Sequence, residues 1–187
     1  MSRTSGWPSA AYAPVSGQGT YASRPAATTV TTGYIYYATD VQEAYRATGT
    51  VGQLASSWTV IPPGGSELAY AQITASQTGL TGATNITGLN VTVVGGDRPL
   101  KVEAQILTQL TSGTNCILTL TDATASVELC EAHDDGAALS PSFHTLYCSA
   151  RVPPLSGATK TYQVSANLTG QVYASTTIPS FVRVTTL

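Results

Sequence analysis

The sequence predicts an all-β protein, built from an extended N-terminal arm, a small β-hairpin module and then an antiparallel β-sandwich or jelly roll. Three observations predict this class. Short segments of alternating apolar and polar residues, rich in β-branched and aromatic types, recur from position 66 onward. Gly, Pro, Asn and Asp residues separate these segments and mark turns. No segment has the apolar period of an amphipathic helix.

Residues 1–32 are predicted to form the extended arm. Three prolines interrupt a stretch of Ser, Thr, Gly and Ala that has neither strand nor helix periodicity. We expect a binding partner to order this arm. Trp7, Tyr12 and Tyr21 are spaced along it, which is unusual for a plain linker, and we interpret these three side chains as anchors that dock on a neighbouring subunit.

Residues 33–61 are predicted to form the small β module. Aromatic residues alternate through "GYIYYA", Asp40 begins a turn, and "AYRA" and "SSWTVI" supply two further strands. A unit of this size rarely holds a core alone, so we expect it to need the following domain or symmetry mates. The stretch "IPPGG" at 61–65 then ends the module.

Residues 66–187 are predicted to form the β-sandwich. About eight strands follow one another, with a hairpin expected around residues 122–125. The face away from the core is rich in Thr, Ser and Gln, and only Lys101 and Lys160 are available to protect strand edges. We therefore expect neighbouring subunits to cover these edges. The strand segments are "ELAYAQITA", "NITGLNVTVVGG", "PLKVEAQILTQL", "NCILTLTD", "SVELCEA", "FHTLYCSARV", "KTYQVSANLTG" and "SFVRVTTL".

Charged residues make up only 10% of the chain, against about 25% in ordinary soluble domains. Such a surface is typical of a protein that lies against copies of itself or a partner, and a Thr-rich secreted β protein is the alternative. With a net charge of −2 and eight scattered Lys and Arg residues, the chain is not expected to bind nucleic acid. No apolar run spans a membrane, and residues 1–17 have no apolar core of a secretion signal, so synthesis in a reducing cytosol is expected.

Cysteine usage agrees with a reducing compartment. Cys116, Cys130 and Cys148 form an odd set, which excludes a closed disulfide framework, and their neighbours are apolar or β-forming. We expect free, buried thiols. Whether Cys130 and Cys148 pair remains open at this point.

Catalytic and metal-binding patterns are scarce. The segment "EAHDDG", which contains Glu131, His133, Asp134 and Asp135, is interpreted as a solvated polar turn rather than a divalent-cation site. His144 falls in a predicted strand and is interpreted as structural. No nucleophile elbow, zinc-protease motif, P-loop or dinucleotide fingerprint occurs, so we predict no enzyme activity, no cofactor and no metal. A hydrolase would need a carboxylate pair, drawn from Asp122, Glu128, Glu131, Asp134 and Asp135.

A pattern of about 40 residues runs through the arm and the module. Its positions are Gly19, Thr20, Arg24, Pro25, Gly33, Tyr36, Tyr37, Ala38, Thr39, Asp40, Tyr45, Arg46, Ser57 and Trp58. This pattern resembles a module of tailed-bacteriophage virion proteins, especially fibre-like proteins of tail and head. The resemblance implies a virion component that is usually trimeric and has no catalytic activity. Where chains meet, Arg24 is hypothesised to pair with Asp40.

We therefore predict a bacteriophage virion structural protein, either a capsid decoration or head-fibre protein or a minor tail or tail-fibre component. It would form a homotrimer and attach to capsid or tail proteins through its arm. The alternative is a host-surface carbohydrate or receptor-binding module that stacks sugars on Tyr147, Tyr162 or Tyr173. The candidate assembly contacts are Trp7, Tyr12, Tyr21, Arg24, Tyr36, Asp40 and Trp58.

Overall fold

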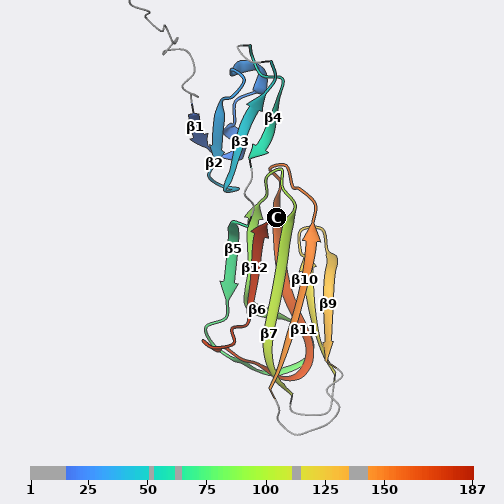
Figure 1. Ribbon diagram of the computed structural model, residues 1–187. Helices are drawn as coiled ribbons and strands as arrows, with labels where there is room; N and C mark the ends of the chain where they lie inside the picture. The colour runs from blue at the N-terminus through green and yellow to red at the C-terminus, as the bar shows by residue number, and fades with distance from the viewer. Residues whose placement is uncertain (1–15, 51–52, 62–64, 111–114, 135–142) are drawn as a thin grey trace, which may run out of the picture. The chain divides into compact units, whose positions relative to one another are not determined.

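The computed structural model divides the chain into two units, residues 1–62 and residues 63–187 (Figure 1). It describes residues 16–50, 53–61, 65–110, 115–134 and 143–187. Regular structure in these ranges is β, apart from two single-turn 3-10 helices, which confirms the predicted all-β class. Neither of these short helices is long or apolar enough to cross a membrane.

The N-terminal unit is a four-stranded sheet in the order β1-β2-β3-β4. Strand β1 runs parallel to β2, whereas β2, β3 and β4 form an antiparallel meander. The bounds are β1 Ser16–Gly19, β2 Ile35–Ala38, β3 Glu43–Thr48 and β4 Ser57–Ile61, with the 3-10 helices η1 Tyr21–Ser23 and η2 Ala27–Thr29 between β1 and β2.

This unit buries a small set of apolar side chains, and its need for the following domain or for symmetry mates stays a prediction. Alternation along β2 and β3 turns one set of side chains inward, and two large tyrosine rings supply most of the buried volume. The buried side chains are Tyr36, Ala38, Val41, Tyr45, Ala47 and Ala55.

The structure also differs from the extended arm expected for residues 1–32. From Ser16 onward the chain pairs with β2, makes η1 and η2, and belongs to the N-terminal unit. This segment lacks the alternation of apolar residues that marks a strand or a helix, and polar groups stabilise it instead. The Thr20 side chain accepts a hydrogen bond from the Ser23 backbone N–H and caps η1. Trp7 and Tyr12 lie outside the described residues.

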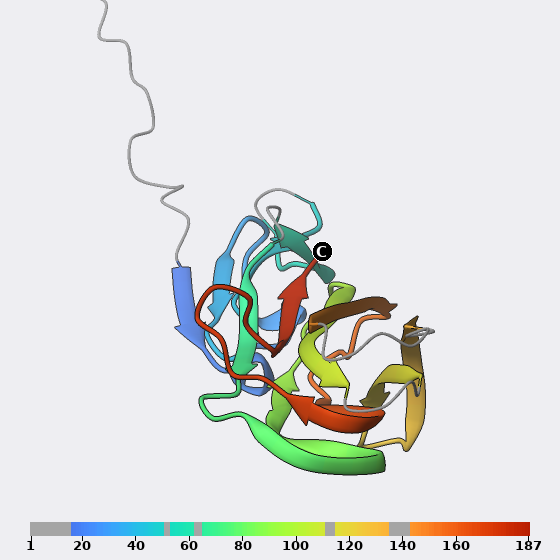
Figure 2. The same ribbon diagram turned by 90° about the horizontal axis from the view of Figure 1, so that it is seen from below.

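The C-terminal unit is an antiparallel sandwich of two layers (Figures 1 and 2). One layer has the order β5-β12-β7-β10, and the other has the order β6-β11-β8-β9. The strands are β5 Glu67–Gln72, β6 Gln77–Val94, β7 Leu100–Leu110, β8 Cys116–Asp122, β9 Val127–Asp134, β10 Phe143–Val152, β11 Thr159–Val172 and β12 Phe181–Thr186. Each of the eight predicted strand segments corresponds to one of them.

The sandwich core forms where the apolar sides of the two layers meet. Strand β7 contributes Leu100, Val102, Ala104 and Ile106, which are all fully buried, and every other strand of the sandwich contributes at least one buried or partly buried apolar residue. The layers are joined at one corner, where β7 and β11 pair over three residues beginning at Gly170 and Leu110. The polar positions of β7 therefore lie together on the outer surface.

Candidate functional site

Arg24 lies among three aromatic rings of the N-terminal unit. Its guanidinium carbon is 4.6 Å from the ring centre of Tyr21, 4.2 Å from that of Tyr45 and 5.5 Å from that of Trp58. These are cation–π distances, and the delocalised guanidinium is suited to stacking on several rings at once. Arg24 thereby ties the segment after η1 to strands β3 and β4.

Hydrogen bonds fix the same segment to the sheet. The Trp58 indole N–H donates to the carbonyl oxygen of Pro25 at 3.0 Å. The Tyr36 hydroxyl donates to the carbonyl oxygen of Thr20 at 3.0 Å and lies 2.9 Å from the Ser23 hydroxyl. Two of the predicted contact residues therefore hold the backbone of residues 20–25 through polar groups at the ends of aromatic rings.

The turn after β2 binds the end of β1. The Asp40 carboxylate accepts a hydrogen bond from the Tyr21 backbone N–H at 2.7 Å, and the Thr39 backbone N–H donates to the carbonyl oxygen of Gly19 at 2.8 Å. Within one chain, Asp40 thus caps the start of η1. The pairing of Arg24 with Asp40 between chains concerns an assembly and stays a prediction.

Asp40→Ala is expected to lower the free energy of unfolding of the N-terminal unit by about 1 kcal/mol, because the Tyr21 N–H loses its acceptor. Asp40→Asn keeps an acceptor oxygen and should lose less than half of that. Urea titration followed by tryptophan fluorescence measures both variants. Equal losses in the two would mean that the carboxylate charge, and not this hydrogen bond, stabilises the turn.

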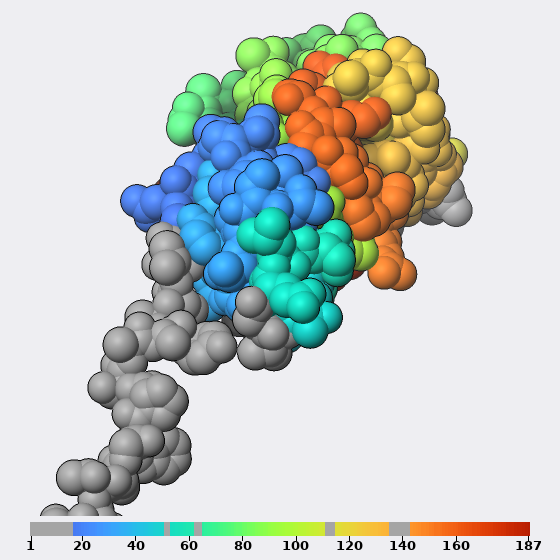
Figure 3. All heavy atoms as spheres, turned by 90° about the horizontal axis from the view of Figure 1, so that it is seen from above, coloured from blue at the N-terminus to red at the C-terminus, as the bar shows by residue number. Residues whose placement is uncertain are grey.

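Four of the residues matched by the phage-module resemblance, Arg24, Tyr36, Asp40 and Trp58, thus take part in one set of contacts. Five of the seven candidate contacts, Tyr21, Arg24, Tyr36, Asp40 and Trp58, join one network. In the space-filling view of Figure 3, the segments of the N-terminal unit, coloured blue to cyan, pack against one another on the side shown. The pattern therefore has a folding role inside the chain, and its role between chains stays a prediction.

A second candidate surface lies on the outer side of the layer β5-β12-β7-β10. Strand pairing puts Arg183 of β12 between Tyr70 of β5 and Glu103 of β7. Tyr70 stacks on Phe181 with ring centres 5.8 Å apart, and the Arg183 guanidinium lies 5.6 Å from the Phe181 ring centre. The name aromatic face is used below for five residues, namely Tyr70, Glu103, Tyr147 of β10, Phe181 and Arg183.

Glu103 is the ionised centre of the aromatic face. Its Oε2 accepts hydrogen bonds from Arg183 Nε at 3.1 Å and Nη2 at 2.8 Å. Its Oε1 is 2.6 Å from Lys101 Nζ and also accepts from the Tyr147 hydroxyl. Burial, the largest single influence, raises the pKa of Glu103, but the hydrogen bonds from Lys101, Tyr147 and Arg183 together lower it to about 2.

The lowered pKa of Glu103 predicts acid destabilisation of the sandwich. A carboxyl whose folded pKa is about 2, against 4.5 ordinarily, stabilises the fold fully above pH 4.5 and loses that contribution as the pH falls to 2. After allowance for solvent screening, the contribution is about 2 kcal/mol. Urea midpoints followed by circular dichroism at pH 7, 4.5 and 2.5 would measure it.

Glu103→Gln is the variant for this prediction, and Glu128→Gln, at an exposed carboxylate of β9, is the control. Glu103→Gln should reduce the change of the urea midpoint with pH, and Glu128→Gln should leave that change as in the parent protein. Some slope should remain, because Asp122 also has a lowered pKa. Burial raises that pKa, but hydrogen bonds from Lys160 and two backbone N–H groups outweigh it. If the urea midpoint of Glu103→Gln fell with pH as steeply as that of the parent protein, Glu103 would not be the source of the acid destabilisation.

The three tyrosines considered for sugar stacking differ in exposure. Tyr147 is 45% exposed, whereas Tyr162 is fully buried in the core and offers no ring to a sugar. Tyr173 is partly buried and packs edge-on against Phe143, with ring centres 5.0 Å apart. Tyr147 is thus the member of this set that the structure leaves accessible.

Residues 131–134 of the acidic segment expected to form a polar turn are part of a strand instead, and Asp135 lies outside the described residues. Strand β9 continues to Asp134, because Cys116, Ile117 and the next residues of β8 pair with it. Glu131 lies 3.1 Å from His133, and Asp134 binds His144 of β10, so these groups partner one another. Among the described residues, no group of three or more His, Cys, Asp or Glu side chains is placed to hold a metal ion.

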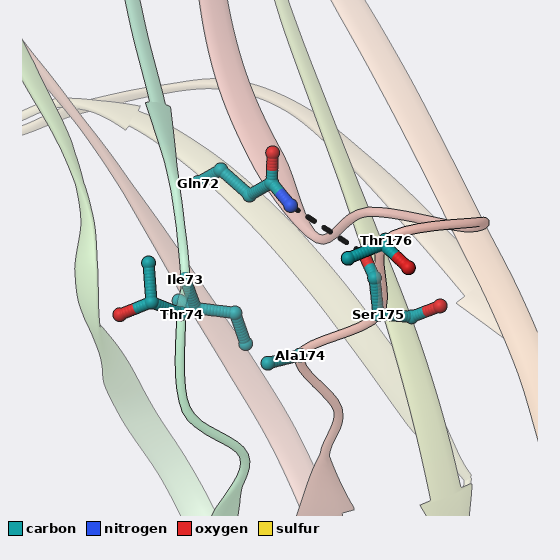
Figure 4. A pocket seen from close by; sticks show the side chains of 6 residues that line it. All are labelled: Gln72, Ile73, Thr74, Ala174, Ser175 and Thr176. Atoms are coloured by element: carbon teal, nitrogen blue, oxygen red, sulfur yellow. Dashed lines mark hydrogen bonds between the residues drawn. The ribbon is translucent and has the colours of Figure 1, made fainter.

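A hollow of about 250 Å³ lies beside the loop between β11 and β12 (Figure 4). The amide nitrogen of Gln72 donates to the carbonyl oxygen of Ser175 at its rim. The side chains that line the hollow are neutral and provide no acid or base for catalysis. The lining residues are Gln72, Ile73, Thr74, Ala174, Ser175 and Thr176.

No protein-family model and no curated protein matches the chain. Among solved structures, it is similar to murine APRIL, with 10% identity over 67% of this chain and 100% of that chain and a TM-score of 0.47. It is also similar to the Eiger TNF of S. frugiperda, with 11% identity over 63% of this chain and 91% of that chain and a TM-score of 0.38. A third similar structure is a carbohydrate-binding module of Cellvibrio mixtus lichenase 5A, solved with cellotriose. Its identity is 14% over 65% of this chain and 99% of that chain, and its TM-score is 0.35.

The protein is thus an all-β protein with a compact N-terminal unit followed by an antiparallel sandwich.

Proposed function

We propose that this chain is a non-catalytic structural protein of a tailed-bacteriophage virion, on the head or the tail, that forms homotrimers. The N-terminal region attaches it to other virion proteins, and the sandwich faces outward. The observation that carries the proposal is the convergence of Tyr21, Arg24, Tyr36, Asp40 and Trp58 on one network. Four of these five residues, all but Tyr21, belong to the pattern that resembles a phage module, and their common physical role supports that resemblance.

The aromatic face supports self-association. Tyr70 and Tyr147 are 43% and 45% exposed on a layer whose central carboxylate is already neutralised by Lys101 and Arg183. Exposed aromatic rings beside an arginine whose N–H groups already have acceptors are typical of the cores of protein interfaces. The low charge of the whole chain reduces the repulsion between copies.

Gold-antibody labelling of virions that carry the protein, read by electron microscopy, tests the location. Gold over the head would identify a decoration protein or head fibre, and gold along the tail would identify a tail or fibre component. An antibody that binds the native protein but leaves intact particles unlabelled would overturn the exposed virion role. Light scattering on the purified full chain measures the oligomer, and a monomer at every concentration would overturn the homotrimer.

The second candidate function is binding of host-surface glycans, favoured by the exposure of Tyr147 beside Glu103 and Arg183. An aromatic ring next to charged hydrogen-bonding groups is a suitable platform for a sugar. A glycan array probed with the full chain tests it. Tyr147→Ala should abolish binding, while Tyr37→Ala, at a tyrosine of similar exposure in the N-terminal unit, should not. Absence of any glycan signal would remove this candidate.

A further inference from the structure

Two cysteines meet at one open side of the sandwich. Strand β9 is the outer strand of one layer, and β10 is the outer strand of the other. Cys130 of β9 and Cys148 of β10 lie across this gap, with the Cys148 thiol donating to the carbonyl oxygen of Cys130 at 3.9 Å. Both thiols are free. No backbone ladder joins β9 to β10, so the two layers are held on this side by side-chain contacts.

The surroundings of the two sulfurs favour contact between them. Cys130 stands opposite Leu120 on β8 and packs against the core while staying partly accessible. Cys148 stands opposite Ala104 on β7 and is 6% exposed. Burial raises the pKa of both thiols, and the hydrogen bond between the two side chains raises that of Cys148 further while it opposes the rise at Cys130.

The third cysteine is separate from this pair. Cys116 begins β8, four residues before Leu120, which corresponds to roughly 13 Å along a strand. It is fully buried, and burial raises the pKa of its thiol to about 11. Cys116 therefore serves as an internal control for any reaction of the other two.

We infer that Cys130 and Cys148 form a disulfide bond when the folded protein meets an oxidising small-molecule disulfide, and that this bond closes the open side of the sandwich. The reduced state belongs to the glutathione-rich compartment in which the three thiols stay free, and the bonded state belongs to oxidising surroundings. The inference does not depend on the proposed function.

The reaction balances as two thiol–disulfide exchanges. The Cys130 thiolate attacks one sulfur of glutathione disulfide, forms a mixed disulfide and releases one glutathione thiolate. The Cys148 thiolate then attacks the Cys130 sulfur and releases the second glutathione. The protein loses two protons and two electrons, and glutathione disulfide gains them as two thiols. Cys130 is the first nucleophile because it is the more accessible of the two.

The rate of closure should depend on pH. Burial raises the pKa of Cys130 and, more strongly, that of Cys148, and the neighbouring Glu128 and Glu131 carboxylates act in the same direction. Few thiolates exist at neutral pH as a result. We expect closure to be slow at pH 7 and to accelerate about tenfold per pH unit toward pH 9.

Peptide mapping of the oxidised full chain tests the inference. Trypsin cannot separate the cysteines because no Lys or Arg lies between Lys101 and Arg151, but a glutamate-specific protease cuts after Glu128 and Glu131 and isolates each of them. After incubation with glutathione disulfide at pH 8.5 and thiol blocking, we expect one cross-linked species joining the Cys130 and Cys148 peptides. It should be about 2 Da lighter than their sum, with Cys116 free.

Thermal unfolding supplies a second readout. Oxidation should raise the melting temperature of the sandwich by about 5–10 °C in the parent protein and in Cys116→Ser, and by nothing in Cys130→Ser. Cys130 is the position to change because it is partly accessible and serine keeps its size. The inference is overturned if folded protein keeps both thiols free after prolonged oxidation, or if the cross-link involves Cys116 or joins two chains.

Discussion

Replacing Tyr45 by alanine is expected to lower the free energy of unfolding of the N-terminal unit by about 4 kcal/mol. Tyr45 is fully buried, and its hydroxyl donates to the Glu43 carboxylate. Its ring lies 5.9 Å edge-on from that of Tyr21 and 4.2 Å from the Arg24 guanidinium. The substitution therefore removes the largest buried side chain of a small unit and one of the rings around Arg24.

Tryptophan fluorescence measures this loss selectively. Both tryptophans, Trp7 and Trp58, precede residue 63 in the sequence, so urea unfolding followed by their emission does not report on the sandwich. Tyr37→Ala is the matched control, because this tyrosine is 41% exposed on β2 and should cost less than about 1 kcal/mol. If both substitutions had the same effect, the unit would not depend on the core built around Tyr45.

Gly170→Ala is expected to destabilise the sandwich by about 3 kcal/mol. Gly170 is the residue of β11 that faces Leu110 of β7 at the corner where the two layers are joined. A methyl group there would overlap the carbonyl oxygen of Gln109 and lie 3.1 Å from the Leu110 Cα. Since both obstacles are backbone atoms, they move only if the corner opens.

Gly82→Ala is the control for Gly170→Ala, because it carries the backbone penalty of replacing a glycine without the steric overlap. Gly82 lies in β6 with a φ of +70°, and nothing lies within 4 Å of an added methyl group. Its substitution should cost only the penalty of a left-handed conformation, about 1 kcal/mol. Thermal unfolding followed by far-UV circular dichroism compares the two variants. Similar melting temperatures would show that the approach of β7 to β11 at this corner is not a tight constraint.

The strands of the sandwich could be predicted because their signals are local. Alternation along "PLKVEAQILTQL" separates inner from outer positions without knowledge of any partner, and the structure keeps that separation. The parallel pairing of β1 with β2 could not be predicted, because residues 16–19 are Ser, Gly and Gln without periodicity. Their order comes from pairing with Ile35–Ala38 of β2, 19 positions later, and from the hydrogen bond that the Thr39 backbone N–H donates to the Gly19 carbonyl oxygen.

The candidate sites divide in the same way. The position of Arg24 in the pattern was recognised, but its three ring contacts depend on how β3 and β4 fold back over it. Glu103 escaped the sequence analysis entirely, since its main partner, Arg183, is 80 residues away. A carboxylate at an outward position of an otherwise charge-poor strand, two residues after a lysine, was the signal that could have indicated it.

Strand order also sets the sequence in which the two units can fold. The N-terminal unit pairs strands β1 to β4, which are close along the chain, whereas β12 lies between β5 and β7, so its layer stays open until Phe181–Thr186 has been synthesised. Contacts between distant segments form slowly, and local ones form quickly. In refolding experiments, tryptophan emission should therefore recover before the circular dichroism of the sandwich. On the ribosome, the first unit is complete and available to partners while the second is still being made.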